Sequence, residues 1–124
     1  MLAGLFKVKD SYNTDVVSLR LGTVAISDQA DKNACADKVK TSRKTLTTEL
    51  RHRGFTVLES QGNFVLATPP TTHNAESPYL TIKQQEILVR SFKQPGLDDK
   101  LSISVGTPAH NQVLIRRLTS PIRA

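Results

Sequence analysis

Apolar residues recur along the chain at two spacings, one typical of helices and one typical of strands. The clearest helical stretch covers residues 29–53, where apolar side chains separated by 4, 7 and 4 positions fall on one face. Asp28 is a suitable N-cap, basic residues gather at the far end, and Gly54 suits the left-handed position after a helix. The apolar face of this helix consists of Cys35, Val39, Leu46 and Leu50.

Three shorter helices are predicted from their caps and their apolar spacing. Asp15 and its polar neighbours can cap a helix that runs through about Ser27. Ser77 followed by Pro78 predicts a capped helix over residues 79–85, with proline at the first helical position. A second cap-then-proline pair starts the last helix, whose apolar side chains are Leu114, Ile115 and Leu118.

Four short apolar runs are predicted to be strands, at residues 55–60, 64–68, 86–92 and 100–105. A Gln-Gly-Asn turn separates the first two, which favours an antiparallel hairpin. We therefore expect the α+β class: a two-layer α/β sandwich, with a mostly antiparallel four-stranded sheet covered by helices. The 124 residues suffice for a single domain, and residues 119–124 are expected to be a frayed tail.

Composition agrees with a globular protein that has no membrane partner. The chain is 38% hydrophobic and 23% charged, and no apolar run approaches the roughly 20 residues that span a bilayer. Its first residues do not resemble a secretory signal. A lone Cys35 excludes an internal disulfide or a multi-cysteine zinc site and fits a cytoplasmic setting. Since Cys35 lies on the apolar helix face, we expect it to be buried in packing.

The net charge of +6 raises nucleic acid as a partner. The densest basic runs are residues 38–44 (KVKTSRK) and 51–53 (RHR). They come with no RNA-binding aromatic motif, zinc-finger spacing or helix-turn-helix. We therefore expect solvated basic faces and no nucleic-acid binding, although a basic patch can also serve acidic small molecules.

Common catalytic signatures are missing, including the P-loop, GxGxxG, GxSxG and HExxH motifs. The spacing of His52, His73 and His110 does not bring them together, and surface positions are expected for all three. Asp98 and Asp99 form an adjacent pair in a turn and are expected to be solvated. No catalytic, cofactor-binding or metal-binding residue is predicted within this chain.

One arginine and one strand remain as candidates for an anion-binding site. Arg90 closes an apolar run, and its planar fork of donors matches a carboxylate or phosphate, although an exposed strand-end arginine is also common. In the last strand, alternation places Ser102 and Ser104 on the face opposite the apolar residues. The helix that starts after Thr107 adds free backbone N–H groups, a weak anion site in general.

Four segments together resemble the C-terminal third of the histidinol-phosphate aminotransferase family. They run in order from about Lys7 to Leu118, nearly the whole chain. They read KVKDSYNTDVVSLRLGTVAISD, NACADKVKTSR, GFTVLESQGNFVLATPP and ILVRSFKQPGLDDKLSISVGTPAHNQ. The ordered set is specific, although no single segment is.

The resemblance implies a fold type I pyridoxal-phosphate aminotransferase that works as a homodimer. A large domain would hold the cofactor, and the enzyme would exchange an amino group between histidinol phosphate and glutamate in histidine biosynthesis. The family's cofactor lysine lies upstream, so Lys7 and Lys9 are not candidates, and residues 1–13 would be a remnant of the interdomain connection. This chain alone is expected neither to bind pyridoxal phosphate nor to transaminate.

Two residues depart from the family pattern and one matches it. Arg90 matches the arginine that contacts a substrate anion. Ser102 stands where the family has a carboxylate-binding arginine, and losing a charge-assisted pair forfeits about 1.5–3 kcal/mol. Glu86 stands where the family usually has glycine before the strand, which costs about 1 kcal/mol if that position needs positive φ.

Two other readings remain open. A non-catalytic, stand-alone binding or interaction module derived from this domain is favoured by Ser102 and by the missing lysine. The intact loop SFKQPGLDDK favours a parent enzyme instead. A basic nucleic-acid binder rests on charge alone.

Overall fold

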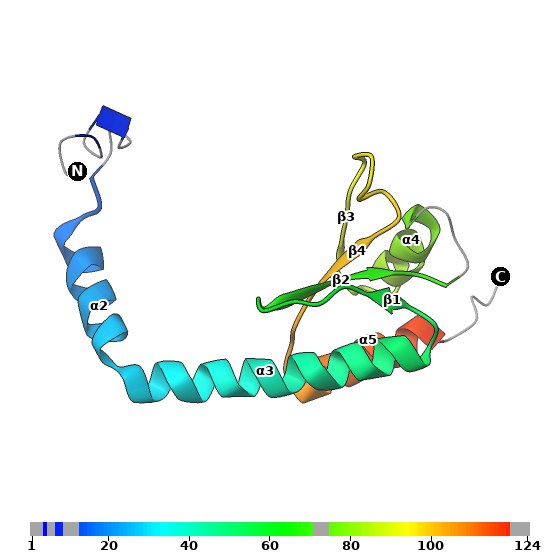
Figure 1. The fold of residues 1–124 in the computed structure, drawn as a ribbon, viewed down its shortest axis with the longest axis horizontal. Coiled ribbons are helices and arrows are strands. Elements are labelled where there is room, and N and C mark those ends of the chain that lie inside the picture. The colour runs from blue at the N-terminus through cyan, green and yellow to red at the C-terminus, as the bar shows by residue number, and fades with distance from the viewer. Residues whose placement is uncertain (1–3, 5–6, 9–12, 71–74, 120–124) are drawn as a thin grey trace. The chain divides into compact units, whose positions relative to one another are not determined.

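The computed structural model describes residues 4, 7–8, 13–70 and 75–119. Helices and strands follow in the predicted order, α-α-β-β-α-β-β-α (Figure 1). The elements are α2 (Val16–Ser27), α3 (Gln29–His52), β1 (Thr56–Val57), β2 (Phe64–Thr68), α4 (Glu76–Gln84), β3 (Arg90–Ser91), β4 (Leu101–Ser104) and α5 (Pro108–Thr119).

The strands form one open antiparallel sheet in the order β1-β2-β4-β3. β1 and β2 are the predicted hairpin, with Thr56 opposite Thr68. β4 lies between β2 and β3, so the two segments that follow the hairpin add to its β2 edge. The α+β sandwich with a four-stranded antiparallel sheet is thus confirmed.

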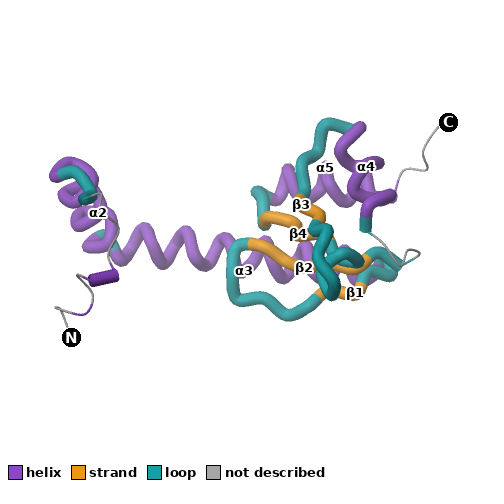
Figure 2. The backbone as a smooth tube through the Cα atoms, turned by 90° about the horizontal axis from the view of Figure 1, so that it is seen from above, coloured by secondary structure: helices purple, strands orange, loops and turns teal. Residues whose placement is uncertain are grey.

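One face of the sheet packs against helices and forms the core. The strands pass over α3 and α5 (Figures 1 and 2). Leu46 and Leu50 of α3 are buried there, as their spacing predicted, and Ile82 of α4 joins them. The remaining core side chains are Phe55, Val57, Val65, Ala67, Ala75, Leu101, Ile103, Leu114 and Ile115. Because side chains alternate along a strand, the opposite sheet face carries the residues between these.

The ends of α3 match the capping chemistry in the sequence. The Asp28 carboxylate accepts from the Asp31 N–H at 3.0 Å. At the other end Gly54 has φ +82°, and the N–H of Phe55 donates to the carbonyl of Leu50 at 3.1 Å. This hydrogen bond is typical of a Schellman motif, and Phe55 enters the core. The same sequence step therefore stops the helix and starts β1.

The predicted start of α4 at Ser77–Pro78 was wrong. The helix begins at Glu76, and its N-cap residue Ala75 makes no side-chain capping bond. Ala75 is fully buried, and its N–H donates to the carbonyl of Asp98 at 3.0 Å. Burial and a contact distant in sequence thus fix this helix end.

The strand predicted over residues 86–92 is much shorter than expected. Only Arg90 and Ser91 pair in the sheet. The preceding residues complete the end of α4, because the N–H of Ile87 donates to the carbonyl of Ile82 at 3.2 Å. Local helix termination thus outweighs the apolar run that predicted a longer strand.

The chain divides into two compact units, residues 1–35 and 36–124. The first unit contains α2, in which no residue is buried. Cys35 is exposed, so the prediction that it is buried was wrong. Its position on the apolar face does not bury it because the buried part of that face is confined to Leu46 and Leu50. No helix in the described ranges is long and apolar enough to cross a membrane.

Candidate anion site on the open face of the sheet

Arg90 and Ser102 lie directly opposite each other in the paired strands β3 and β4. Leu66 of β2 lies opposite Ser102 on the other side. Opposite residues of an antiparallel pair project on one face, with Cβ atoms about 4.5–5.5 Å apart. The register therefore brings together the two positions that the sequence singled out. Their row lies on the face away from the core, since the neighbouring Leu101 is buried.

The guanidinium group of Arg90 is held from one side and open on the other. Its central carbon lies 4.9 Å from the ring centroid of Phe92, a cation–π contact. The side chain is exposed, and within the described residues it makes no hydrogen bond or ion pair. An arginine fork has five N–H donors and matches a carboxylate or phosphate with two parallel bonds. Arg90 can therefore accept an anionic partner without first breaking an internal ion pair.

Because position 102 is serine, Arg90 carries the one positive charge in the row formed by Arg90, Ser102 and Leu66. The Ser102 side chain is half-buried, and its short hydroxyl cannot supply the charge or reach of an arginine. An arginine at this position would lie directly opposite Arg90. Like charges facing each other across a sheet repel, but together they would hold a doubly charged anion more strongly.

Glu86 adopts a left-handed backbone conformation, the condition under which the family's glycine would be favoured at this position. Its φ is 61°, and among the described residues it alone has positive φ without being glycine. Its N–H donates to the carbonyl of Lys83 at 3.0 Å, and the next N–H closes onto Ile82. This pair of bonds forms a Schellman motif with a Cβ-bearing residue at its strained position. Glu86 thus sets the chain's direction just before Arg90 at a local energetic cost.

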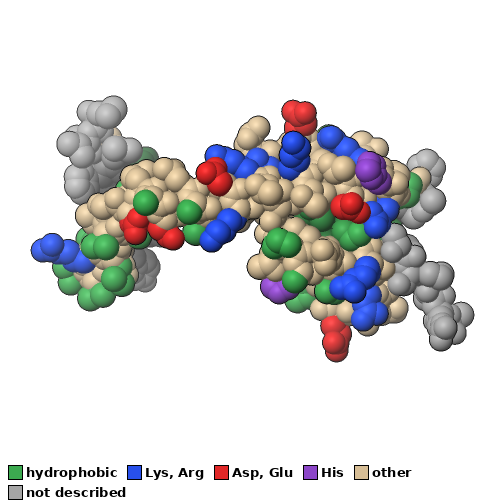
Figure 3. All heavy atoms as spheres, turned by 90° about the horizontal axis from the view of Figure 1, so that it is seen from below, with side chains coloured by type: hydrophobic (Ala, Val, Ile, Leu, Met, Phe, Trp, Pro, Cys, Tyr) green, Lys and Arg blue, Asp and Glu red, His purple; other side chains and the backbone are tan. Residues whose placement is uncertain are grey.

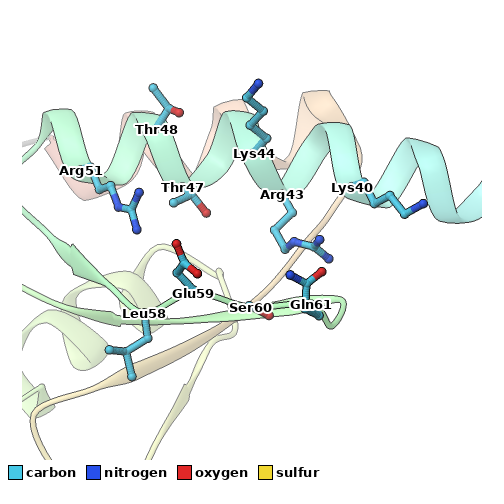
Figure 4. A pocket seen from close by; sticks show the side chains of 10 residues that line it. All are labelled: Lys40, Arg43, Lys44, Thr47, Thr48, Arg51, Leu58, Glu59, Ser60 and Gln61. Carbon is cyan, nitrogen blue, oxygen red and sulfur yellow. The ribbon is translucent and has the colours of Figure 1, made fainter.

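The basic run of α3 lines a cavity of about 500 Å³ against the β1–β2 hairpin (Figure 4). Arg43 donates to the carbonyl of Gly62 at 2.6 Å, and Arg51 donates to the carbonyl of Val57 at 3.0 Å. Glu59 lies between these two arginines in the view (Figure 4). The arginines therefore hold the hairpin onto α3, and other Lys and Arg side chains spread over the surface (Figure 3).

The remaining candidates behave as solvated or structural groups. His52 and His110 are exposed, as predicted, while His73 lies outside the described residues. Asp98 is exposed, whereas Asp99 is half-buried and bonds to the ammonium of Lys100 at 2.5 Å. That hydrogen bond lowers the pKa of Asp99 below its usual value. In the described part of the chain no three His, Cys, Asp or Glu side chains gather as a metal site.

Sequence reasoning missed the buried Asn111. Its side-chain oxygen accepts from the N–H of Gly106 at 3.0 Å, and its amide donates to the carbonyl of the same glycine at 3.2 Å. The two bonds tie the end of β4 to α5. A Gly-Thr-Pro helix start followed by asparagine was the available signal, because an asparagine amide can satisfy a backbone N–H and C=O together.

Residues 1–118 match the family model described as "Aminotransferase class I and II". Histidinol-phosphate aminotransferase 1 of Trichormus variabilis is 53% identical over 99% of this chain and 35% of its own length. The corresponding protein of Microcystis aeruginosa is 39% identical over 94% of this chain and 32% of its own length. The chain thus spans about a third of the length of these curated relatives.

Solved structures show the same fold. A Burkholderia pseudomallei protein, provisionally described as an aminotransferase, matches with a TM-score of 0.80 at 24% identity, over 94% of this chain and 35% of that one. The histidinol-phosphate aminotransferase from Clostridium acetobutylicum matches with a TM-score of 0.59 at 26% identity, over 64% and 25%. The chain belongs to the class I and II aminotransferase family, and among its members it is closely similar to histidinol-phosphate aminotransferases.

Proposed function

We propose that this chain is the small C-terminal domain of a pyridoxal-phosphate-dependent aminotransferase that exchanges an amino group between histidinol phosphate and glutamate. The observation that carries the proposal is 53% identity over 99% of the chain to a histidinol-phosphate aminotransferase. The full-length protein would be a cytoplasmic homodimer, as the family resemblance implies.

Arg90 is the residue proposed to contact the substrate. Its open guanidinium on the exposed sheet face supports the role, because an anion could bind both nitrogens without displacing an internal partner. The cation–π contact with the ring of Phe92 favours this position of the side chain. Arg90 would orient the substrate through its negative group and would move no proton itself.

The cofactor would belong to the part of the relatives that this chain does not span. Pyridoxal phosphate, when bound, supplies the electron sink for amino transfer. Two cavities support this assignment, because neither the one beside α3 nor the one between α3 and α5 is lined by an aromatic ring that could stack on a pyridine. The chain alone would therefore be inactive, and its contribution would be to bind and orient substrate.

The test is to join this chain to the other two thirds of the Trichormus variabilis relative in place of that protein's own C-terminal third. The joined protein is expected to transfer the amino group of histidinol phosphate to 2-oxoglutarate. The 124-residue chain alone, supplied with pyridoxal phosphate, is expected to give no turnover. A folded, cofactor-loaded joined protein without turnover would contradict the proposed function.

A stand-alone binding or interaction module is the second candidate, and Ser102 is the observation that favours it. If Ser102 marks a lost substrate anchor, Ser102→Arg in the joined protein should improve substrate affinity by about tenfold or more. Ser104→Arg is the matched control, because Ser104 lies two residues further along β4 and projects on the same face of the sheet. It should not improve substrate affinity. If Ser102→Arg changes neither affinity nor rate, the lost-anchor explanation is wrong.

A further inference from the structure

The cavity of about 500 Å³ between α3 and the β1–β2 hairpin draws positive charge from both basic runs of the sequence. Four of the residues that line it are cationic, and one, Glu59, is anionic. The cations are Lys40, Arg43, Lys44 and Arg51. The cavity therefore carries an excess of three positive charges, half of the net charge of +6 of the whole chain.

The two arginines reach into this cavity and are already held in place. Arg43 and Arg51 point from α3 towards the hairpin, and each bonds to a hairpin carbonyl through one terminal nitrogen (Figure 4). A guanidinium group has five N–H donors, so both arginines keep donors for a ligand. Because their positions are fixed in advance, little conformational freedom is lost when a ligand binds.

The two lysines lie at the rim of the cavity beside Arg43. Lys40, Arg43 and Lys44 are three and four residues apart on α3, so their side chains are neighbours on the helix surface. Both lysines extend away from the hairpin in Figure 4, but a flexible four-carbon stem lets an ammonium group swing over the opening. Lys44 makes no hydrogen bond or ion pair within the described residues. Lys40 pairs with Asp37 at 2.9 Å, yet both side chains are more than half exposed, and such a pair is weak in water.

Glu59 restricts which anions fit the cavity. Its carboxylate lies between Arg43 and Arg51 in Figure 4, yet it makes no ion pair or hydrogen bond in the part of the chain that the structure describes. A ligand must keep its negative charge away from this carboxylate and present a hydrogen-bond donor to it. Thr47 and Gln61 add neutral polar groups nearby (Figure 4). None of the described lining residues is aromatic, so the cavity offers no ring on which a nucleobase could stack.

We propose that this cavity binds a small phosphate ester that carries hydroxyl groups, of the sugar-phosphate class. A phosphate monoester carries about 1.5–2 negative charges at neutral pH, which suits the three cations at one end better than a single carboxylate does. The hydroxyl groups of the ligand would donate to Glu59. The volume of the cavity lies within the range of about 300–1,000 Å³ that is typical of small-molecule sites.

The cavity is separate from the candidate anion site at Arg90. Its described lining residues all lie between positions 40 and 61, on α3 and the hairpin segment, and none comes from β3 or β4. They also belong to one compact unit, residues 36–124. The inference therefore goes beyond the proposed function and does not rest on it, because a joined protein without turnover can still bind a ligand here.

The experiment titrates the 124-residue chain and the cofactor-loaded joined protein with sorbitol phosphate in a calorimeter. Sorbitol phosphate is a suitable probe because it does not react with amines as a reducing sugar would. Both proteins are expected to bind it at least about tenfold more tightly than inorganic phosphate, since a hydrogen bond to a charged acceptor contributes about that factor. Neutral sorbitol should not bind detectably. Binding by neither protein, or by the short chain alone, would overturn the inference.

Paired lysine variants locate the phosphate group. Lys40→Gln combined with Lys44→Gln should weaken binding of sorbitol phosphate by at least about tenfold. Lys32→Gln combined with Lys38→Gln is the matched control, because it removes the same charge from the same helix outside the cavity. It should weaken binding by less than about threefold, since exposed charges at a distance are screened by salt. Equal losses from the two pairs would show general attraction to a basic surface and would refute a defined site.

Glu59→Gln tests the recognition of the hydroxyl groups. It should tighten binding of inorganic phosphate and remove the preference for sorbitol phosphate, because it takes away both the repelling charge and the charged acceptor. A preference that persists unchanged in this variant would contradict the role of Glu59.

Two further measurements keep the test decisive. If a variant fails to fold, amide chemical shifts of the unsubstituted chain replace it: shifts at residues 40–44 and 59–61 on adding sorbitol phosphate support the site, and shifts confined to other residues overturn it. A short DNA duplex is titrated in parallel. If the duplex binds more tightly than sorbitol phosphate and both lysine pairs weaken it equally, the basic face is a nucleic-acid surface and the inference is wrong.

Discussion

Replacing Glu86 by glycine should make this chain more stable, which is unusual for a substitution to glycine. Glu86 has φ 61°, and a left-handed conformation costs an ordinary residue about 1–2 kcal/mol. Glycine avoids that cost but loses about 0.5–1 kcal/mol more conformational entropy on folding. The side chain is exposed and makes no hydrogen bond or ion pair within the described residues.

The net expectation is therefore a gain of about 0.5–1 kcal/mol in the free energy of unfolding, since no side-chain contact is lost. For a domain of this size that gain raises Tm by about 2–6 °C. Urea and thermal unfolding of Glu86→Gly, followed by circular dichroism, measure both quantities.

Glu86→Ala is the matched control, because alanine also removes the carboxylate but keeps the Cβ that causes the strain. It should be no more stable than the parent chain. If Glu86→Gly is equal to the parent or less stable, or if alanine gives the same gain, backbone strain at this position is not the cause.

Three further substitutions test the fold that carries Arg90. Gly54→Ala should cost more than about 1 kcal/mol, because φ is +82° and the added Cβ would lie 3.1 Å from a proline carbon; an unchanged urea midpoint would refute this. Asn111→Ala should cost about 1–3 kcal/mol, because it leaves the partly buried N–H and carbonyl of Gly106 without their side-chain partner; an unchanged urea midpoint would contradict this. The bond from Lys100 lowers the pKa of Asp99 from 3.8, so its stabilising effect is complete above that pH and disappears as the pH falls through the lower folded value. Urea midpoints of Asp99→Asn and the parent should accordingly converge in acid, and a constant difference across the titration would contradict the assignment.

Much of the fold follows from local signals in the sequence. Gly54 and Asp28 mark the ends of α3, and the Gln-Gly-Asn turn gives the hairpin, because these signals act within a few residues. The start of α4 did not follow from such a signal. Ala75 is fixed by burial and by a bond to Asp98, a contact distant in sequence that outweighs a nearby Ser-Pro pair.

The candidate site was only partly predictable. Alternation placed Ser102 on the polar strand face, but nothing local to Arg90 gave its register with β4. The register depends on how α4 ends at Glu86 and how the Pro-Gly loop returns the chain. The exposure of Cys35 was missed for a related reason: a helical face shows which residues align, and only tertiary packing decides how far along the helix that face is covered.

The substrate role of Arg90 is tested most directly by the KM of the joined protein for histidinol phosphate. Arg90→Gln should raise that KM by about tenfold or more, since it removes a charge-assisted contact worth about 1.5–3 kcal/mol. Arg90→Lys should recover part of the loss, because lysine keeps the charge but not the planar fork. An unchanged KM in a folded Arg90→Gln protein would contradict the proposal that this arginine binds the substrate.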